Sequence, residues 1–247
     1  MWGGAVVLAA CGGGADGAQR PAPGVPGAAG SGSAAAPAGG AGGAGPSGAA
    51  VNDTVATVVF MGTSLTAGYG LSDPGQAYPA VLQRRADSLG LSVRVVNAGL
   101  SGETSAGALR RVDWVLRGPV DAFVLETGAN DGLRALDVDS TRANIVAAIR
   151  RVRSLRPDVR IYLVQMEAPP NLGADYTRRF REMYPAVARA EGVELLPFLL
   201  ERVAGRPALN QPDGVHPTAE GARQVAATLW PALEGLFREL DASAEGA

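Results

Sequence analysis

The pattern of apolar and polar positions changes near residue 55. From there on, short apolar runs rich in β-branched residues alternate with stretches in which apolar residues recur at helical spacing. The apolar runs predict five strands, over 54–62, 92–99, 120–128, 159–167 and 192–198. The amphipathic stretches predict five helices, near 76–89, 104–116, 140–155, 176–190 and 217–238. The sequence therefore predicts an alternating order of strand and helix from residue 54 onward.

Strands that are separated by helices and consist almost wholly of apolar residues are typical of a parallel sheet with both faces covered. In such a sheet, ligands bind beyond the C-terminal strand ends, where the strand order reverses. Polar clusters follow the first three predicted strands: GTSL at 62–65, NAGLSGETS at 97–105 and GANDG at 128–132. We therefore expect any chemistry at this edge of the sheet.

The first fifty residues have a different composition from the rest. Residues 12–50 consist mainly of Gly, Ala, Pro and Ser, with no aromatic residue and a single large aliphatic one, Val25. Such a segment cannot bury enough apolar surface to offset the entropy lost on ordering. We expect a disordered tether over 12–53, one folded domain over 54–240 and a short disordered tail over 241–247.

The start of the chain, MWGGAVVLAAC, has a short apolar run that ends in Leu8-Ala9-Ala10-Cys11. This segment, residues 1–11, resembles a bacterial lipoprotein signal with its lipobox. The resemblance implies that Cys11 becomes the N-terminus and carries lipid. It also implies a lipoprotein of the bacterial cell envelope that faces the periplasm or the cell surface, and Gly12 after the cysteine favours the outer membrane.

Composition excludes several other classes. The 22 basic residues are all arginine and the formal net charge is −2. The sequence has neither a basic tail nor aromatic residues interleaved with basic ones, the two features that would indicate nucleic-acid binding. With one histidine and one cysteine, the sequence offers no cluster of metal ligands, so we expect no metal.

The single histidine, His216, lies in DGVHP at 213–217. A serine hydroxyl needs a base to become a nucleophile, and a histidine base is usually oriented by a carboxylate. Ser64 follows the first strand, His216 is the one available imidazole, and Asp213 is within reach of it. Each signal has a plain structural alternative, because Ser64 is also a typical helix cap and Asp-Gly marks a turn.

Two further residues could stabilise an oxyanion, which needs donors aimed at the position where charge develops. Gly102 can offer its backbone N–H and Asn130 its side-chain amide. Their structural alternatives are a turn glycine before a helix capped by Ser101 or Thr104, and an asparagine that holds a loop.

Four blocks together, MGTSLTAGYG with Ser64, NAGLSGETS with Gly102, ETGANDGL with Asn130 and DGVHP with Asp213 and His216, resemble the SGNH (GDSL-type) hydrolases. The match runs in order from about 57 to 238. It is closest to the bacterial thioesterase I, lysophospholipase and arylesterase branch.

The resemblance implies a flavodoxin-like three-layer α/β/α fold with a mostly five-stranded parallel sheet, and a serine esterase without cofactor. Ser64 would be the nucleophile, His216 the base and Asp213 its orienting acid. Ser64 N–H, Gly102 N–H and the Asn130 amide would form the oxyanion hole. The substrates would be carboxylic esters or thioesters of small alcohols, aryl groups or lysophospholipids. We expect a monomer held to a membrane by its N-terminal lipid.

The chain departs from the family motif Gly-Asp-Ser-Leu at Thr63. The motif aspartate is not a member of the triad, so we expect altered hydrogen bonding in this turn and an intact mechanism. We expect the acyl pocket between 132–137 and 167–176.

Three other readings are weaker. The α/β-hydrolase elbow G-x-S-x-G fails because Thr66 stands where its last glycine would be. A nucleotide or flavin binder would need a phosphate loop, and GTSLTAGYG lacks its glycine spacing. A non-catalytic lipid- or glycan-binding module on the same fold is favoured only by Thr63.

Overall fold

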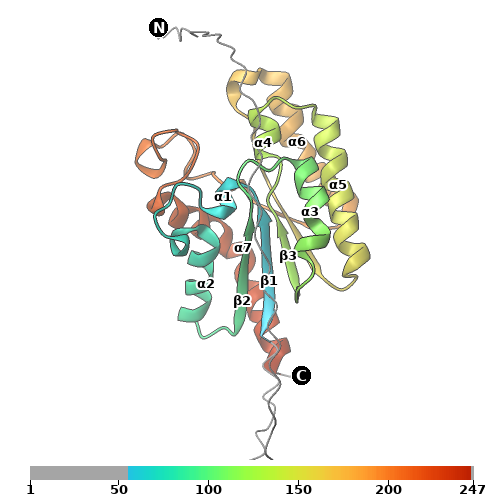
Figure 1. The fold of residues 1–247 in the computed structure, drawn as a ribbon, viewed down its shortest axis with the longest axis vertical. Coiled ribbons are helices and arrows are strands. Elements are labelled where there is room, and N and C mark those ends of the chain that lie inside the picture. The colour runs from blue at the N-terminus through green and yellow to red at the C-terminus, as the bar shows by residue number, and fades with distance from the viewer. Residues whose placement is uncertain (1–54, 246–247) are drawn as a thin grey trace, which may run out of the picture. The chain divides into compact units, whose positions relative to one another are not determined.

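The computed structural model describes residues 55–245. The predicted signal at 1–11, the lipidation candidate Cys11 and the predicted tether up to residue 53 lie outside the described residues. The described part contains one parallel sheet with helices on both faces (Figure 1). This arrangement confirms the predicted three-layer α/β/α fold.

The sheet has five strands in the order β2-β1-β3-β4-β5, and every neighbouring pair is parallel. The strands are β1 (Ala56–Gly62), β2 (Val93–Gly99), β3 (Ala122–Leu125), β4 (Arg160–Val164) and β5 (Glu194–Leu196). All residues of β1 and β3 are buried, as expected for central strands covered on both faces.

The long helices form the two outer layers. Figure 1 shows α2 (Tyr78–Ser88) and α7 (Ala219–Glu245) on one face, and α3 (Ser105–Val115), α5 (Val138–Leu155) and α6 (Ala174–Glu191) on the other. Each of these helices buries one apolar stripe against the sheet, as α5 does with Ile145, Ile149 and Val152.

The strand order reverses at β1. The chain moves from β1 to β2 on one side and then crosses to β3 on the other side of β1. Loops that leave the C-terminal ends of β1 and β3 therefore diverge, and the space between them is where ligands bind in this class of sheet. The polar clusters after β1, β2 and β3 converge there.

The structure differs from the sequence-based predictions in two places. Helix α7 continues to Glu245, so most of the tail predicted as disordered over 241–247 is helical. The segment DASAE contains good helix formers, and Asp241 accepts a hydrogen bond from the Ser92 N–H at 2.7 Å. Two short helices, α1 (Ser64–Ala67) and α4 (Ala129–Leu133), occupy segments expected as loops. Within residues 55–245, no helix is both long and apolar enough to cross a membrane.

Candidate active site

Ser64 is the first residue of the short helix α1, immediately beyond β1. The turn is tight because a Cβ on Gly62 would lie 2.0 Å from Thr66 Oγ1, and only glycine leaves the helix room to fold back over the strand end. Thr63 caps α1, its hydroxyl accepting from the Leu65 N–H at 3.4 Å. This turn places Ser64 at the C-terminal edge of the sheet.

His216 lies in a loop that is closed on itself. The Gln211 N–H donates to His216 O at 2.7 Å, and an isolated antiparallel bridge joins Asn210 to Pro217. Gly214 has a φ of 71°, which the Asp-Gly turn requires. The loop therefore fixes the backbone on both sides of the imidazole.

The structure brings Ser64, His216 and Asp213 into one hydrogen-bonded chain. His216 Nε2 lies 2.8 Å from Ser64 Oγ, and His216 Nδ1 lies 2.7 Å from Asp213 Oδ2. A carboxylate can only accept, so Nδ1 carries a proton and Nε2 is left to accept the serine proton. This is the geometry that general-base activation of a serine requires.

The carboxyl of Asp213 is held in its ionised form. Its Oδ1 accepts from the N–H groups of Val215 at 2.9 Å and His216 at 3.0 Å. These bonds, above all that of the His216 backbone, lower the pKa of Asp213 from 3.8 to about 2. Asp213 can therefore accept from the imidazole throughout the neutral range.

The ring of Tyr69 packs beside the imidazole of His216. Its ring centroid lies 4.7 Å from that of His216, and its carbonyl accepts from Gln211 Nε2 at 2.7 Å. The same amide donates to Pro217 O at 2.9 Å. Gln211 thus ties the segment after Ser64 to the histidine loop.

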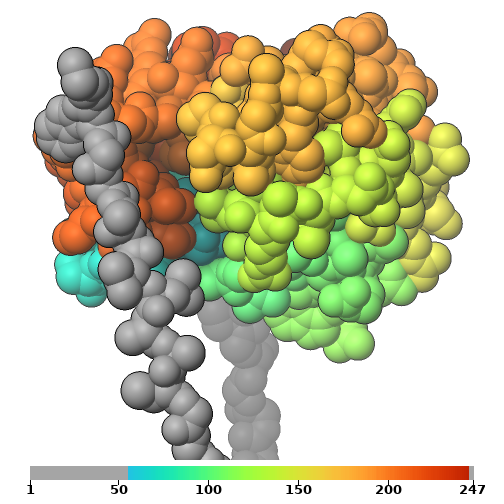
Figure 2. Space-filling view, turned by 90° about the horizontal axis from the view of Figure 1, so that it is seen from above, coloured from blue at the N-terminus to red at the C-terminus, as the bar shows by residue number. Residues whose placement is uncertain are grey.

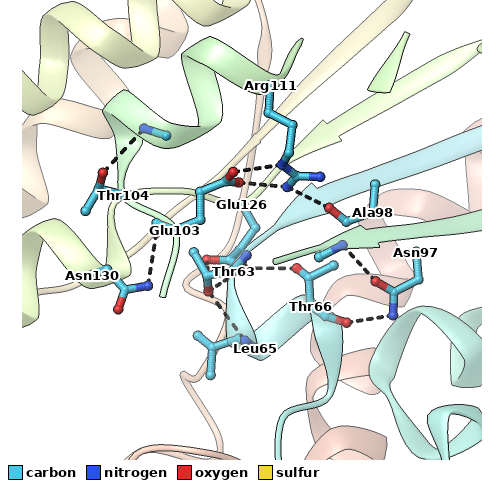
Figure 3. Close-up of polar contacts among 12 residues, drawn as sticks. Thr63, Leu65, Thr66, Asn97, Ala98, Glu103, Thr104, Arg111, Glu126 and Asn130 are labelled. Carbon is cyan, nitrogen blue, oxygen red and sulfur yellow. Dashed lines mark hydrogen bonds and ion pairs between the residues drawn. The ribbon is translucent and has the colours of Figure 1, made fainter. Parts of the chain in front are cut away.

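The predicted oxyanion donors lie on two loops that are bonded to each other. The Asn130 Nδ2 group donates to Glu103 O at 3.0 Å, which leaves its second proton for another acceptor (Figure 3). Among residues 55–245, neither the Ser64 N–H nor the Gly102 N–H has a hydrogen-bond acceptor. Gly102 has a φ of 78°, a conformation that favours glycine.

Asp131 braces this pair of loops, a role that the sequence-based reasoning missed. The side chain is 2% exposed and accepts from Ser105 N at 2.8 Å and Ser105 Oγ at 2.5 Å. Its Oδ1 also lies 3.3 Å from Thr141 Oγ1. Asp131 therefore joins α4 to the first turns of α3 and α5. Its place directly after Asn130 was visible in the sequence, but the partners were not.

Glu126 is a second residue that the sequence-based reasoning missed, although an acid that ends an apolar strand is an unusual signal. It lies buried beneath the Ser64 turn, and its Oε2 accepts from Thr63 N at 2.7 Å, Thr63 Oγ1 at 2.9 Å and Thr66 Oγ1 at 2.9 Å (Figure 3). Tyr78 OH lies 2.8 Å from Thr66 Oγ1. Burial, partly offset by these hydrogen bonds, raises the pKa of Glu126.

The Glu126 contacts explain how the turn accommodates Thr63. The Thr63 side chain presents a hydroxyl that donates to Glu126, where the family motif would place a second carboxyl against the first. The altered hydrogen bonding expected for this turn is thus a threonine-carboxylate contact that ties the turn carrying Ser64 to Glu126.

The two segments expected to line an acyl pocket lie side by side. Tyr176 OH donates to Leu136 O at 2.7 Å, and Leu133 and Leu136 are exposed beside the candidate site. A crevice that includes Ser64 and Tyr78 holds only about 10 Å³, too little for an acyl chain.

The residues that the structure describes contain no group of three or more His, Cys, Asp or Glu side chains placed to hold a metal ion. The polar groups that do converge are a serine, an imidazole, a carboxylate and free N–H donors. Together with the strand order, they define the protein as an α/β hydrolytic enzyme of the serine type.

Comparisons with known proteins carry this identification further. The sequence profile of the GDSL-like Lipase/Acylhydrolase family matches residues 60–224. Esterase TesA of Pseudomonas aeruginosa is 36% identical over 73% of this chain and 89% of its own length. The thioesterase 1/protease 1/lysophospholipase L1 of Escherichia coli K12 is 34% identical over 69% of this chain and 79% of its own.

Solved structures of esterases share this fold. The crystal structure of TesA superposes with a TM-score of 0.68 and 36% identity, covering 73% of this chain and 99% of that one. AlinE4, an SGNH-hydrolase family esterase, superposes with a TM-score of 0.60 and 40% identity, covering 73% and 96%. The chain belongs to the GDSL-like lipase/acylhydrolase family and is a serine ester hydrolase, which confirms the predicted branch and class.

Proposed function

We propose that the protein hydrolyses carboxylic esters through an acyl-enzyme on Ser64. The observation that carries the proposal is the chain of hydrogen bonds from Asp213 through His216 to Ser64, at 2.7 and 2.8 Å. The N–H groups of Ser64 and Gly102, which have no acceptor within residues 55–245, and the second proton of the Asn130 amide support the proposal, because an oxyanion needs such donors.

In this mechanism, His216 Nε2 takes the Ser64 proton as Oγ attacks the carbonyl carbon. The carbonyl π electrons move to the oxygen, which the three donors stabilise. The oxyanion then re-forms the carbonyl and expels the alkoxide or thiolate, to which His216 returns the proton. Water, deprotonated by His216, attacks the acyl carbonyl carbon, and the second oxyanion collapses to expel Ser64 Oγ. His216 returns the proton to Ser64 Oγ as the carboxylic acid is released.

The relatives support the kinds of substrate, since their names include esterase, arylesterase, thioesterase and lysophospholipase. We propose that aryl esters, thioesters and lysophospholipids are substrates of this chain, with the acyl group lying along 132–137 and 167–176. We also propose that Cys11 carries lipid and holds the enzyme at the periplasmic side of the cell envelope, where esters and lysophospholipids are more accessible than acyl-CoA.

The first test compares wild type with Ser64→Ala and Asn130→Ala on p-nitrophenyl butyrate. We expect Ser64→Ala to be inactive and unlabelled by a fluorophosphonate probe. Asn130→Ala should lower kcat by roughly a hundred- to a thousandfold. Wild-type turnover by Ser64→Ala would refute the mechanism. A folded wild-type protein that neither labels nor turns over would instead indicate a binding module.

A separate test addresses the lipid anchor. Cells that express the full chain are fractionated with and without Cys11→Ser. We expect the wild type in the membrane fraction and the variant in the soluble fraction with unchanged esterase activity. Equal distribution of the two forms would refute lipidation at Cys11.

A further inference from the structure

A shallow hollow of about 580 Å³ lies directly beside the loop that carries Gly102. Its walls come from residues 100–104, from the exposed side of α3 and from Arg134 at the end of α4. Trp114 and Leu100, which flank it, are 60% and 49% exposed. The hollow therefore combines accessible apolar side chains with charged ones.

The charged groups of this hollow are mostly basic. Three arginines line it, Arg110, Arg111 and Arg134, against one acid, Glu103. Glu103 is engaged by Arg111, with Nε to Oε1 and Nη2 to Oε2 both at 2.7 Å. Within residues 55–245, Arg110 and Arg134 form no ion pair. Two unneutralised cations thus remain here, in a chain whose formal net charge is −2.

Arg134 is bonded to the backbone of the oxyanion loop. Its Nη2 donates to Gly102 O at 3.2 Å, and a Cβ built on Gly102 would lie 3.9 Å from the same nitrogen. Because the Gly102 N–H is a proposed oxyanion donor, Arg134 contacts a residue that we propose to bind the oxyanion. A substrate bound there would present neighbouring groups to Arg134.

The hollow is lined only by residues of 100–134, so the histidine loop at 210–217 does not contribute to it. Figure 2 shows a depression between the orange-red segment before α7 and the green and yellow-green segments, so the histidine loop and the segments that line the hollow lie on opposite sides of that depression. The leaving group must depart beside His216, because the imidazole returns its proton to it. Arg110 and Arg134 therefore face the acyl part of the substrate more directly than the leaving group.

We propose that this hollow is an anion subsite that takes a carboxylate or phosphate carried by the ester substrate. The planar guanidinium of Arg134 suits such a group, because it can donate two parallel hydrogen bonds. Arg110 adds a second positive charge, and Leu100 and Trp114 would cover the methylenes that lead to the anion. This inference rests on the proposed esterase function and deepens it by assigning a charge preference.

The test uses matched pairs of esters at low salt. On the acyl side, the p-nitrophenyl monoester of succinate is compared with p-nitrophenyl valerate. On the leaving-group side, 4-butyryloxybenzoate is compared with 4-butyryloxybenzamide. For each pair, the ratio of kcat/KM for the anionic ester to kcat/KM for the neutral ester is measured in wild type, Arg110→Ala, Arg134→Ala and the double variant.

We expect the ratio of kcat/KM to fall about tenfold in the double variant, the size expected for a charge-assisted contact. Any loss that Arg134→Ala causes through the Gly102 loop affects both esters of a pair and cancels in the ratio. The control is Arg189→Ala, which removes an exposed arginine of α6 and should leave both ratios unchanged. Raising the salt concentration should compress the wild-type ratio toward that of the double variant.

A fall in the kcat/KM ratio of the acyl pair or of the leaving-group pair supports the subsite. The pair that responds shows which part of the substrate carries the anion. If Arg134→Ala slows neutral and anionic esters equally, the arginine only holds the Gly102 loop, and the subsite is refuted. Unchanged ratios in both pairs refute it too, although Ser64-dependent turnover of the neutral esters would leave the esterase function standing. Loss of that turnover in wild type would refute both proposals.

Discussion

At the scale of single residues, the carboxyl of Glu126 lies in the protein interior, and this burial is the main cause of its raised pKa. Its side chain is buried, and no arginine or histidine within residues 55–245 forms an ion pair with it. The donors that face it are Thr63 and Thr66, and Tyr78 and Tyr184 are the titratable groups that it influences from α2 and α6. A lone buried carboxyl costs free energy in its charged form, so its protonation is linked to folding.

Replacing Glu126 by glutamine tests this linkage. A raised pKa in the folded protein means that the native state binds the proton more readily than the unfolded chain. Wild-type stability therefore loses a contribution as pH rises above the ordinary glutamate pKa of 4.5, by at most about 1.4 kcal/mol per pH unit. Glu126→Gln removes that slope.

The measurement is urea denaturation of both proteins from pH 4 to pH 8. We expect Glu126→Gln to gain stability relative to wild type as pH rises, and the two free energies of unfolding to approach each other near pH 4. Glu103→Gln is the matched control, because that glutamate pairs with Arg111. Parallel curves for wild type and Glu126→Gln would contradict a raised pKa.

At the scale of elements, the candidate site is held together by short segments that sequence patterns detect poorly. Helices α1 and α4 have four and five residues, too few to show a helical period. The five strands were indicated by their apolar runs and the five long helices by their helical period. Their bounds were predicted within a few residues, except that α7 ends at Glu245 and not near 238. The blocks around Ser64, Gly102, Asn130 and His216 were also found.

The contacts between those blocks could not be predicted, because they depend on strand order. The sequence does not say that β3 lies next to β1 with β2 on the far side, and so it does not bring Asn130 to Glu103 O or Glu126 to Thr63. Gln211 and Tyr69 are likewise 142 residues apart in the chain. These contacts follow from the fold and were found only in the structure.

The variant Asp131→Ala tests whether the hydrogen bonds between Asp131 of α4 and Ser105 of α3 position the two loops. This change leaves the buried Ser105 N–H without an acceptor, which costs about 1–3 kcal/mol of stability. It also loosens the loops that carry Gly102 and Asn130, so we expect kcat to fall at least about tenfold with little change in KM. Thermal unfolding and p-nitrophenyl butyrate kinetics measure the two effects.

The matched control is Ser105→Ala, which removes one hydroxyl but keeps the bond from the Ser105 N–H to Asp131 at 2.8 Å. It should lose less stability and keep most of its kcat. If Asp131→Ala lost stability but retained the wild-type kcat at a temperature where it is folded, Asp131 would support the fold without positioning the donors.

At the scale of the whole molecule, the reversal of strand order at β1 explains why four distant blocks form one site. Ser64 and Asn130 leave the sheet at adjacent strands, Gly102 follows the edge strand β2, and the loop before α7 brings His216 to Ser64. Ser64, Gly102 and Asn130 follow the first three strands in chain order. His216 lies much later in the chain, in the segment between β5 and α7. The chemistry therefore depends on β1, β2 and β3 and on the segment that leads into α7.

Because the site residues all lie in the part of the chain that the structure describes, we predict that this part folds and is active without the preceding residues. The structure describes residues 55–245, and the family profile matches within them, at 60–224. Esterase TesA likewise aligns over 89% of its length with 73% of this chain. A variant that begins at Val51 should therefore fold and keep kcat/KM for p-nitrophenyl butyrate within about twofold of the full chain.

A second truncation is the matched contrast, because it removes residues from Pro231 onward and shortens α7. Leu233, Leu236 and Phe237 of this helix are buried in the core, and their loss should abolish folding at 37 °C. Circular dichroism and fluorophosphonate labelling distinguish the two outcomes. If the variant from Val51 failed to label while remaining folded, residues before 51 would contribute to the site, and the site would extend beyond the four blocks that meet at the sheet edge.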